Sequence, residues 1–122
     1  MTSRKILIVD DEKEVAESLA SMLRPAGFLA LLANNGSDGL NLAKTEHPDL
    51  ILLDINMPGM DGGDVARVLS DNPKTKNIPI VYISGMVTQG DEDKIHGRVL
   101  ISKATPAGAI IKKIKNVLGM AL

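Results

Sequence analysis

Five polar side chains stand where an apolar run of the chain gives way to a turn. Asp10 and Asp11 follow the first such run, Asp54 ends the run "DLILLD", and Ser84 and Lys103 mark the ends of two later runs. An ionised carboxylate at the end of a buried run costs free energy unless a neighbouring group needs its charge. Asp54 therefore either caps the next helix or takes part in a reaction.

Together, these side chains would form a site for phosphoryl chemistry. Three carboxylates at close range cannot all stay ionised without a cation, because each raises the pKa of the others. Mg²⁺ prefers oxygen ligands and suits phosphoryl groups. Lys103 and Ser84 would supply a fixed positive charge and a hydroxyl donor for the oxygens of an anion. The set predicts a metal-assisted phosphoryl acceptor in which one carboxylate is the nucleophile.

Short apolar runs alternate with helical patterns along the chain. The predicted strands cover residues 5–10, 28–33, 49–54, 78–84 and 98–102. The predicted helices cover residues 11–27, 34–48, 62–73 and 105–120. Strands that alternate with helices form a parallel sheet with right-handed crossovers. The pattern predicts one doubly wound α/β domain over residues 1–122.

Two helix starts can be predicted in detail. Asp61 or Gly62 opens the helix in 62–73, whereas Thr105 is the expected N-cap of the last helix, with Pro106 as its first residue. The last helix should turn its apolar residues inward; these are Ile110, Ile111, Ile114, Val117 and Leu118. Since Asp61 can serve as the cap, Asp54 is left without a purely structural explanation.

The carboxyl ends of parallel strands meet at one edge of the sheet, where ligands of such folds bind. The five polar side chains should therefore converge there. The loop "DDEKE" after the first strand would repel a flavin phosphate, and neither GxGxxG nor GxxxxGK[ST] is present. Nucleotide and flavin binding of the usual kinds are thereby disfavoured.

Composition sets further limits. The chain has no Cys, which excludes disulfides and thiolate metal sites, and its first apolar run is too short for a signal peptide or a membrane span. A cytoplasmic protein is expected. Residues 1–93 hold all 15 acids against 8 Lys and Arg, giving −7, while residues 94–122 hold 6 Lys and Arg without an acid, giving +6. The basic end is either a partner surface or a solvated helix face.

Three stretches and one lysine resemble the receiver domain of bacterial response regulators, and the resemblance covers essentially the whole chain. They are "ILIVDDE", "HPDLILLDINMPGMDG", "IPIVYIS" and the lysine at position 103 after the fifth strand. The resemblance implies a flavodoxin-like (βα)5 fold with strand order 2-1-3-4-5. It also implies a phosphoprotein of a two-component regulatory system or phosphorelay.

The resemblance further implies a role for each residue. Asp54 would be the phosphoacceptor, and Ser84 and Lys103 would contact phosphoryl oxygens. The implied Mg²⁺ ligands are Asp11, Asp54 and the backbone carbonyl of Asn56, with Asp10 acting through water. Such a domain is not an enzyme in the usual sense, although it catalyses its own phosphotransfer and dephosphorylation.

The implied partners are a sensor histidine kinase or a histidine phosphotransfer protein. The output would pass to another protein through the face formed by the segment 85–97, where the family has its fourth helix, the fifth strand and the last helix. A homodimer formed on phosphorylation is one candidate form of that contact. No membrane contact is expected. Direct contact with nucleic acid is not expected either, since no helix-turn-helix lies outside the α/β pattern.

Three features depart from the family pattern. Leu100 stands where an aromatic residue is usual, and Ala104 stands where Pro follows the lysine. Since a cis bond before a non-proline residue costs about 2.5–4 kcal/mol, a trans Lys103–Ala104 bond is predicted, or else a strained cis bond. The segment 85–97 leaves room for about two helical turns, so a short, irregular or mobile fourth helix is predicted.

Two other functions compete with a phosphorylated switch. A receiver-like scaffold that works without phosphorylation is favoured by Leu100 and Ala104 but not by the intact acidic set. A phosphohydrolase of the haloacid dehalogenase type would need an acid two residues after the nucleophile, where this chain has Asn56.

Overall fold

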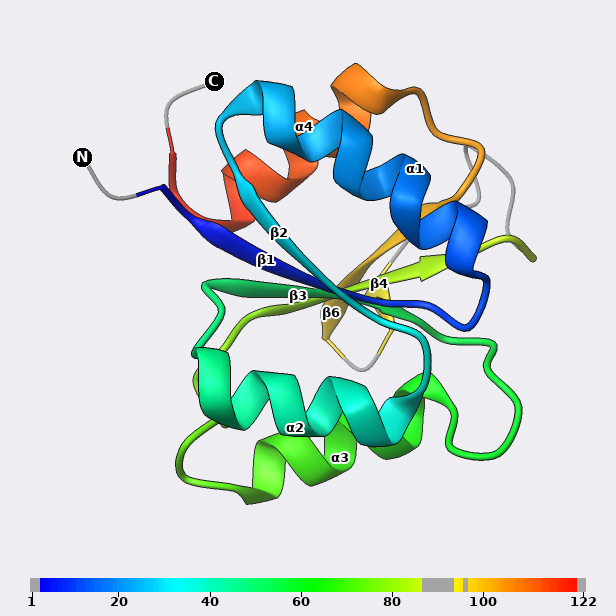
Figure 1. Ribbon diagram of the computed structural model, residues 1–122, viewed down its shortest axis with the longest axis vertical. Helices are drawn as coiled ribbons and strands as arrows, with labels where there is room; N and C mark the ends of the chain where they lie inside the picture. The colour runs from blue at the N-terminus through cyan, green and yellow to red at the C-terminus, as the bar shows by residue number, and fades with distance from the viewer. Residues whose placement is uncertain (1–2, 87–93, 96, 121–122) are drawn as a thin grey trace.

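Five parallel strands form the centre of the molecule (Figure 1). The computed structural model describes residues 3–86, 94–95 and 97–120. The strands are β1 (Lys5–Val9), β2 (Leu29–Ala33), β3 (Leu50–Asp54), β4 (Ile80–Ser84) and β6 (Arg98–Ser102). They lie side by side in the order β2-β1-β3-β4-β6, and the two-residue strand β5 (Lys94–Ile95) pairs with β6 in the antiparallel sense. Because β6 is the fifth parallel strand, the predicted fold and strand order are confirmed.

Helices cover both faces of this sheet. They are α1 (Lys13–Leu23), continued by the 3₁₀ turn η1 (Arg24–Ala26), α2 (Gly36–Glu46), α3 (Gly62–Asp71) and α4 (Ala107–Val117). Figure 1 shows α1 and α4 on one face and α2 and α3 on the other. Every residue of β3 and β4 is buried, as expected for strands covered on both faces.

Alternate residues of each strand enter two separate apolar layers. Ile6 and Ile8 of β1 pack toward α1 and α4, while Leu7 and Val9 pack toward α2 and α3. Leu, Ile, Val and Ala make up most of both layers, because the chain has one Phe and one Tyr. These layers hold the strand ends in fixed positions, and the strand ends carry the polar side chains.

The start of α3 follows the prediction. Asp61 is the N-cap, with its carboxylate accepting from the Asp64 N–H at 2.9 Å, and the Asp64 carboxylate accepts from the Asp61 N–H at 3.2 Å. This reciprocal arrangement is a capping box. It satisfies backbone donors that would otherwise lack partners at the start of the helix.

The start of α4 differs from the prediction by one residue. Pro106, and not Thr105, is the N-cap, and Ala107 is the first helical residue. The Pro106 backbone is extended at ψ 146° and its carbonyl accepts from the N–H groups of Ala109 and Ile110. Thr105 instead lies buried in the preceding turn, where its N–H donates to the Ser102 carbonyl. The predicted inward-facing residues of this helix do contribute to the core.

The segment between β4 and β6 includes the short strand β5. Residues 87–93 and 96, where most of the short fourth helix was predicted, lie outside the described residues. Lys94 and Ile95 do not continue a helix; they pair with Val99 and Arg98 across a turn in which Gly97 has φ +76°. A positive φ suits glycine and allows this turn, and the short fourth helix itself stays a prediction.

Two further findings concern the backbone. Among the described residues every peptide bond is trans, including Lys103–Ala104, which confirms the expected trans form. Within the same part of the chain, none of the helices has the length and apolar character needed to span a bilayer.

Candidate functional site

Four of the predicted residues meet at the carboxyl edge of the sheet. Asp10 follows β1, Asp54 ends β3, Ser84 ends β4, and Lys103 follows β6. The strand registers align these ends, since Asp54 pairs with Ile83 and Ser84 pairs with Ser102. Asp10, Asp54 and Ser84 are at most 3% exposed. The sheet therefore collects residues that are distant in sequence into one small polar site.

Lys103 is the centre of this site. Its Nζ lies 2.9 Å from Asp10 Oδ2, 3.2 Å from Glu12 Oε1 and 3.3 Å from Asp54 Oδ2. Burial alone would lower the pKa of Lys103, but the carboxylates of Asp10 and Asp54 outweigh it and hold the pKa above its ordinary value. Lys103 is therefore a permanent cation at neutral pH, bound to three carboxylates.

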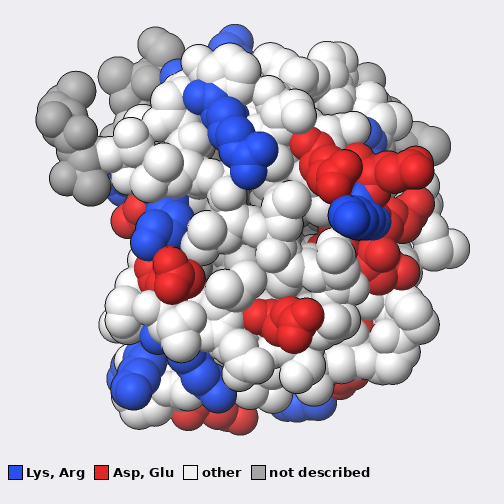
Figure 2. Space-filling view, viewed as in Figure 1, with Lys and Arg blue, Asp and Glu red and all other residues white. Residues whose placement is uncertain are grey.

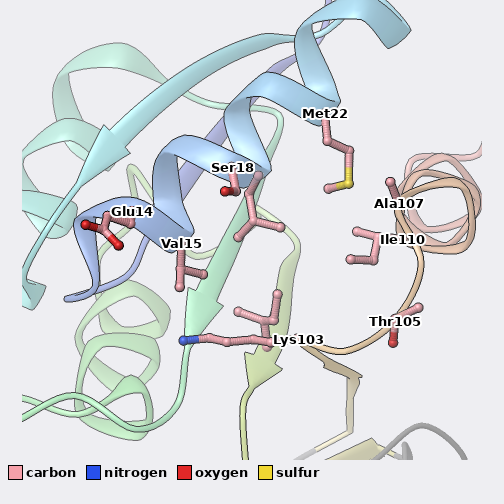
Figure 3. A pocket seen from close by; sticks show the side chains of 10 residues that line it. Glu14, Val15, Ser18, Met22, Lys103, Thr105, Ala107 and Ile110 are labelled. Carbon is pink, nitrogen blue, oxygen red and sulfur yellow. The ribbon is translucent and has the colours of Figure 1, made fainter.

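The stem of Lys103 reaches the acids along a groove between α1 and α4 (Figure 3). The groove has a volume of about 540 Å³ and includes Val15 and Met22 from α1 and Ile110 from α4. Figure 3 shows the Lys103 nitrogen turned away from Ile110, toward the start of α1. The apolar lining of the groove suits the apolar stem of Lys103, whose ammonium group lies at the acids.

Asp54, the last residue of β3, carries a buried carboxylate. Burial raises the pKa of Asp54 to about 6; the Asn56 N–H, which donates to Oδ1 at 3.1 Å, opposes the rise, the Asp10 charge adds to it, and Lys103 opposes it. At neutral pH the carboxylate is still mainly ionised. Its second oxygen, Oδ2, faces Lys103.

Gly62 allows the first turn of α3 to lie directly against Asp54. A Cβ atom at position 62 would lie 2.6 Å from the Asp54 carbonyl oxygen, and the Gly62 N–H donates to the Ile55 carbonyl at 3.0 Å. A larger residue would have to displace backbone here. The helix start and the end of β3 are thereby held in one fixed arrangement.

Asn56 links the turn after β3 to the end of β4. Ser84 Oγ donates to Asn56 Oδ1 at 2.8 Å, and the Met86 N–H donates to Ser84 Oγ at 3.1 Å. The Asn56 N–H meanwhile bonds Asp54. The hydroxyl of Ser84 is therefore held beside the turn that follows Asp54.

Glu12 is a site residue that the sequence analysis missed. It is the N-cap of α1, its N–H donates to Asp10 Oδ1 at 2.9 Å, and its carboxylate pairs with Lys103. Asp10, Asp11 and Glu12 each offer one oxygen, and these oxygens lie within 4.8 Å of one another. The available signal was the third acid in "DDEKE". Asp11 joins the site through this group.

The donor set fits a hard divalent cation. All of the offered atoms are carboxylate oxygens, which Mg²⁺ prefers. Three of the carboxylates, those of Asp10, Glu12 and Asp54, already hold the ammonium of Lys103, so the cluster binds positive charge by its own chemistry. The predicted metal ligands therefore lie in a suitable place, and their assignment stays a prediction.

Leu100, which stands where the family usually has an aromatic residue, lies next to the single tyrosine of the chain. Leu100 on β6 is 9% exposed and pairs with Tyr82 on β4, and both enter the apolar layer next to α2 and α3. The guanidinium carbon of Arg98 lies 6.0 Å from the centre of the Tyr82 ring. The single tyrosine of the chain thus lies on the strand next to the one where the family usually has an aromatic residue.

Comparisons with a family model, with related sequences and with solved structures all identify the same family. The family model of the response regulator receiver domain matches residues 6–116. The polar-differentiation response regulator DivK of Brucella ovis is 30% identical over 122 residues, covering 98% of this chain and 99% of that protein.

Solved structures agree. A response regulator from Desulfuromonas acetoxidans is 29% identical with a TM-score of 0.83, over 95% of this chain and 97% of that one. The N-terminal domain of a response regulator receiver protein from Methanoculleus marisnigri is 27% identical with a TM-score of 0.74, over 98% of this chain and 100% of that one. The chain belongs to the family of response regulator receiver domains of two-component signalling.

Proposed function

We propose that this receiver domain, residues 1–122, is a switch that accepts a phosphoryl group on Asp54. The donor is the phosphohistidine of a sensor histidine kinase or of a histidine phosphotransfer protein. The observation that carries the proposal is the Asp54 carboxylate itself, which is 1% exposed at the end of β3 and 3.3 Å from the Lys103 ammonium. Such a burial is costly, and Asp61 already performs the capping role.

The transfer needs one nucleophile and several groups that hold charge. An Asp54 carboxylate oxygen attacks phosphorus, the bond from phosphorus to the histidine nitrogen breaks, and its electron pair returns to the imidazole. The product on this chain is an aspartyl phosphate. Lys103 places its positive charge beside the phosphoryl oxygens, and Ser84 offers its hydroxyl to one of them.

Mg²⁺ would be held by Asp11, Asp54 and the Asn56 backbone carbonyl, with Asp10 acting through water. When bound, it supplies positive charge that offsets the charges of the carboxylates and of the phosphoryl group. Glu12 adds a fourth acid beside this set, because it shares Lys103 with Asp10 and Asp54.

The same residues serve the return step. A water oxygen attacks phosphorus, the bond from phosphorus to the Asp54 oxygen breaks, and the carboxylate is restored with release of inorganic phosphate. Lys103 again balances the charge of the leaving carboxylate. The domain thus catalyses its own phosphotransfer and dephosphorylation and turns over no separate substrate.

The signal leaves by protein contact at the face that includes β6, α4 and the segment before β6. Lys112, Lys113 and Lys115 give α4 a positive charge without a neighbouring acid on the same helix, which suits an acidic partner. Leu100 and Ala104 lie at this end of the molecule, so a switch on this chain would have to work without the usual aromatic residue at position 100.

The test is intact-mass measurement after incubation with acetyl phosphate, with Mg²⁺ and with chelator. The wild type and Asp61→Asn should each gain one phosphoryl group when Mg²⁺ is present, and Asp54→Asn should gain none. Asp61→Asn is the matched control, because it makes the same acid-to-amide change seven residues away at an exposed cap. A folded wild-type protein that gains no phosphoryl group would favour the scaffold function instead.

A further inference from the structure

The two edges of the sheet are protected differently. At one edge, β5 pairs with β6 in the antiparallel sense and covers part of its backbone. At the other edge, β2 pairs with β1 alone, and no strand of the described part of the chain lies beyond it. An edge strand carries a row of unpaired N–H and C=O groups that can pair with another chain.

The hydrogen bonds of β2 identify which groups face outward. The Leu29 N–H donates to the Arg4 carbonyl, and the Ala33 carbonyl accepts from the Asp10 N–H. Because such bonds alternate along a parallel strand, residues 29, 31 and 33 face β1. The N–H and C=O groups of Ala30 and Leu32 therefore face away from the sheet. Arg24 confirms this direction, since its side chain donates to the Ala30 carbonyl at 3.3 Å from outside.

The side chains of β2 give little protection against pairing. The strand reads LALLA, with no charge, proline or glycine, and Leu29 is 51% exposed. Figure 2 shows an uncharged strip over this edge, with charged side chains gathered around it. Natural edge strands usually carry Lys, Pro or a bulge that opposes pairing. Here the outward backbone groups of β2 are covered mainly by the long, exposed hydrogen bond from Arg24 to the Ala30 carbonyl.

We infer that β2 is a self-association edge that pairs in the antiparallel sense with β2 of a second copy of this chain. A two-fold axis at Leu31 places Ala30 opposite Leu32 of the second copy, and each such pair exchanges both backbone hydrogen bonds. The two sheets then continue as one. The outward groups of β2 thus complement themselves, which is why the occupant is a second copy.

The charges beside the strand also favour a second copy. Glu17, Ser21 and Arg24 are exposed and follow one another at steps of four and three residues, so they lie along one side of α1 and its 3₁₀ continuation. The same two-fold axis runs the α1 helices of the two copies antiparallel to each other. The acidic end of one row then meets the basic end of the other.

This association is separate from the proposed phosphoryl transfer. It uses the β2 edge, whereas the proposed output face lies at β6 and α4, and it leaves Lys103 and Asp54 uncovered. It therefore requires no phosphorylation. A failure of the pairing would leave the proposed function unaffected, and the reverse also holds.

The test is sedimentation velocity of the unphosphorylated chain, from about 1 μM to about 500 μM, where weak dimers form and dissociate. Ala30→Pro removes an outward N–H that has no bond to β1, a position where an edge strand tolerates proline. Leu29→Lys adds a charge at the exposed end of the strand. Val68→Lys is the control, an apolar-to-Lys change at another exposed position, on α3, where Val68 is 36% exposed.

The wild type and Val68→Lys should form dimers as concentration rises. Ala30→Pro should dimerise more weakly by roughly tenfold to a hundredfold, since each dimer loses two backbone donors, and Leu29→Lys should also weaken it. In the wild-type dimer the Ala30 and Leu32 amides should exchange more slowly than in the monomer. A wild type that stays monomeric throughout overturns the inference, as do dimers that both edge variants leave unchanged. Far-UV circular dichroism checks that each variant is folded, independently of the proposed phosphorylation.

Discussion

Two aspartates of one short segment, Asp54 and Asp61, have opposite relations to the fold. Asp54 is 1% exposed, accepts a single backbone hydrogen bond from Asn56, and has its pKa raised to about 6. Asp61 is exposed and caps α3 through a reciprocal pair of bonds with Asp64. An aspartate side chain thus lies in one case where its ionisation is costly, and in the other where it accepts a hydrogen bond from a backbone N–H at the helix start.

This difference between the two aspartates distinguishes a residue present for folding from one present for function. Replacing a good N-cap costs about 0.5–2 kcal/mol, so Asp61 has a sufficient structural reason to be present. Asp54 has none, because its ionised form is destabilised by burial and by Asp10. The free energy that keeps it in place comes from the apolar layers on either side of β3 and from Lys103. A costly residue held by the rest of the fold is a mark of a functional site.

The largest expected effect comes from removing the cation beside Asp54. Lys103→Met keeps the apolar stem but leaves Asp10 and Asp54 buried without their ion-pair partner. Breaking a buried pair in this way costs about 3–5 kcal/mol, so urea unfolding near neutral pH should show a loss of this size. Added Mg²⁺ should recover part of it.

The control for that measurement is Lys5→Met. Lys5 makes an exposed pair with Glu46 at 3.8 Å, and exposed pairs contribute about 0–1 kcal/mol. Lys103→Met with a loss no larger than that of Lys5→Met would mean that Lys103 does not hold the acids in place. The distinction between Asp54 and Asp61 would then need another cause.

The next effect has the opposite sign. Asp54→Asn removes a carboxylate whose ionised form is disfavoured in the folded state, so the variant should be more stable than the wild type above about pH 7 without Mg²⁺. A pKa raised from 3.8 to about 6 corresponds to at most about 3 kcal/mol. Stability of the wild type is lowest above the folded pKa and recovers as pH falls, because the folded state takes up the proton first.

The gain from Asp54→Asn should therefore shrink to roughly half by about pH 5 and vanish below the unfolded pKa near 4. Chemical denaturation of the two proteins at several pH values measures it. Asp61→Asn should leave stability almost unchanged over the same range, since Asn caps a helix as well as Asp. A gain from Asp54→Asn that does not depend on pH would show that removal of the charge is not its cause.

Strand ends were the most predictable part of the molecule. Asp10, Asp54, Ser84 and Lys103 each end or follow an apolar run, and parallel topology alone brings such positions to one edge. Glu12 was missed because its contact with Lys103 spans 91 positions and depends on how the turn after β1 folds. Strand order comes from tertiary packing, so periodicity gave no sign that β2 would be an edge strand; only the order implied by the family resemblance placed it there.

Differences between the predicted and the observed element ends arise from the backbone conformation of single residues. The helix start at Thr105 was placed one residue early, because Pro106 can be either a first helical residue or the residue before it, and here its ψ of 146° makes it the cap. Lys94 and Ile95 became a strand because Gly97 adopts a positive φ that lets the chain turn back onto β6. Neither choice is fixed by hydrophobic periodicity, which sets element types better than element ends.

The smallest expected effect isolates the structural aspartate. Asp61→Ala removes the side-chain acceptor for the Asp64 N–H and should lower the free energy of unfolding by about 1 kcal/mol, while Asp61→Asn keeps the cap and most of the stability. Both variants should accept a phosphoryl group on Asp54 as the wild type does, because α3 still starts at Gly62 against the Asp54 carbonyl. Thermal unfolding with intact-mass measurement of the same samples tests both points. If Asp61→Ala lost phosphorylation while still folded, the cap would be part of the site, and the separation between the two aspartates would fail.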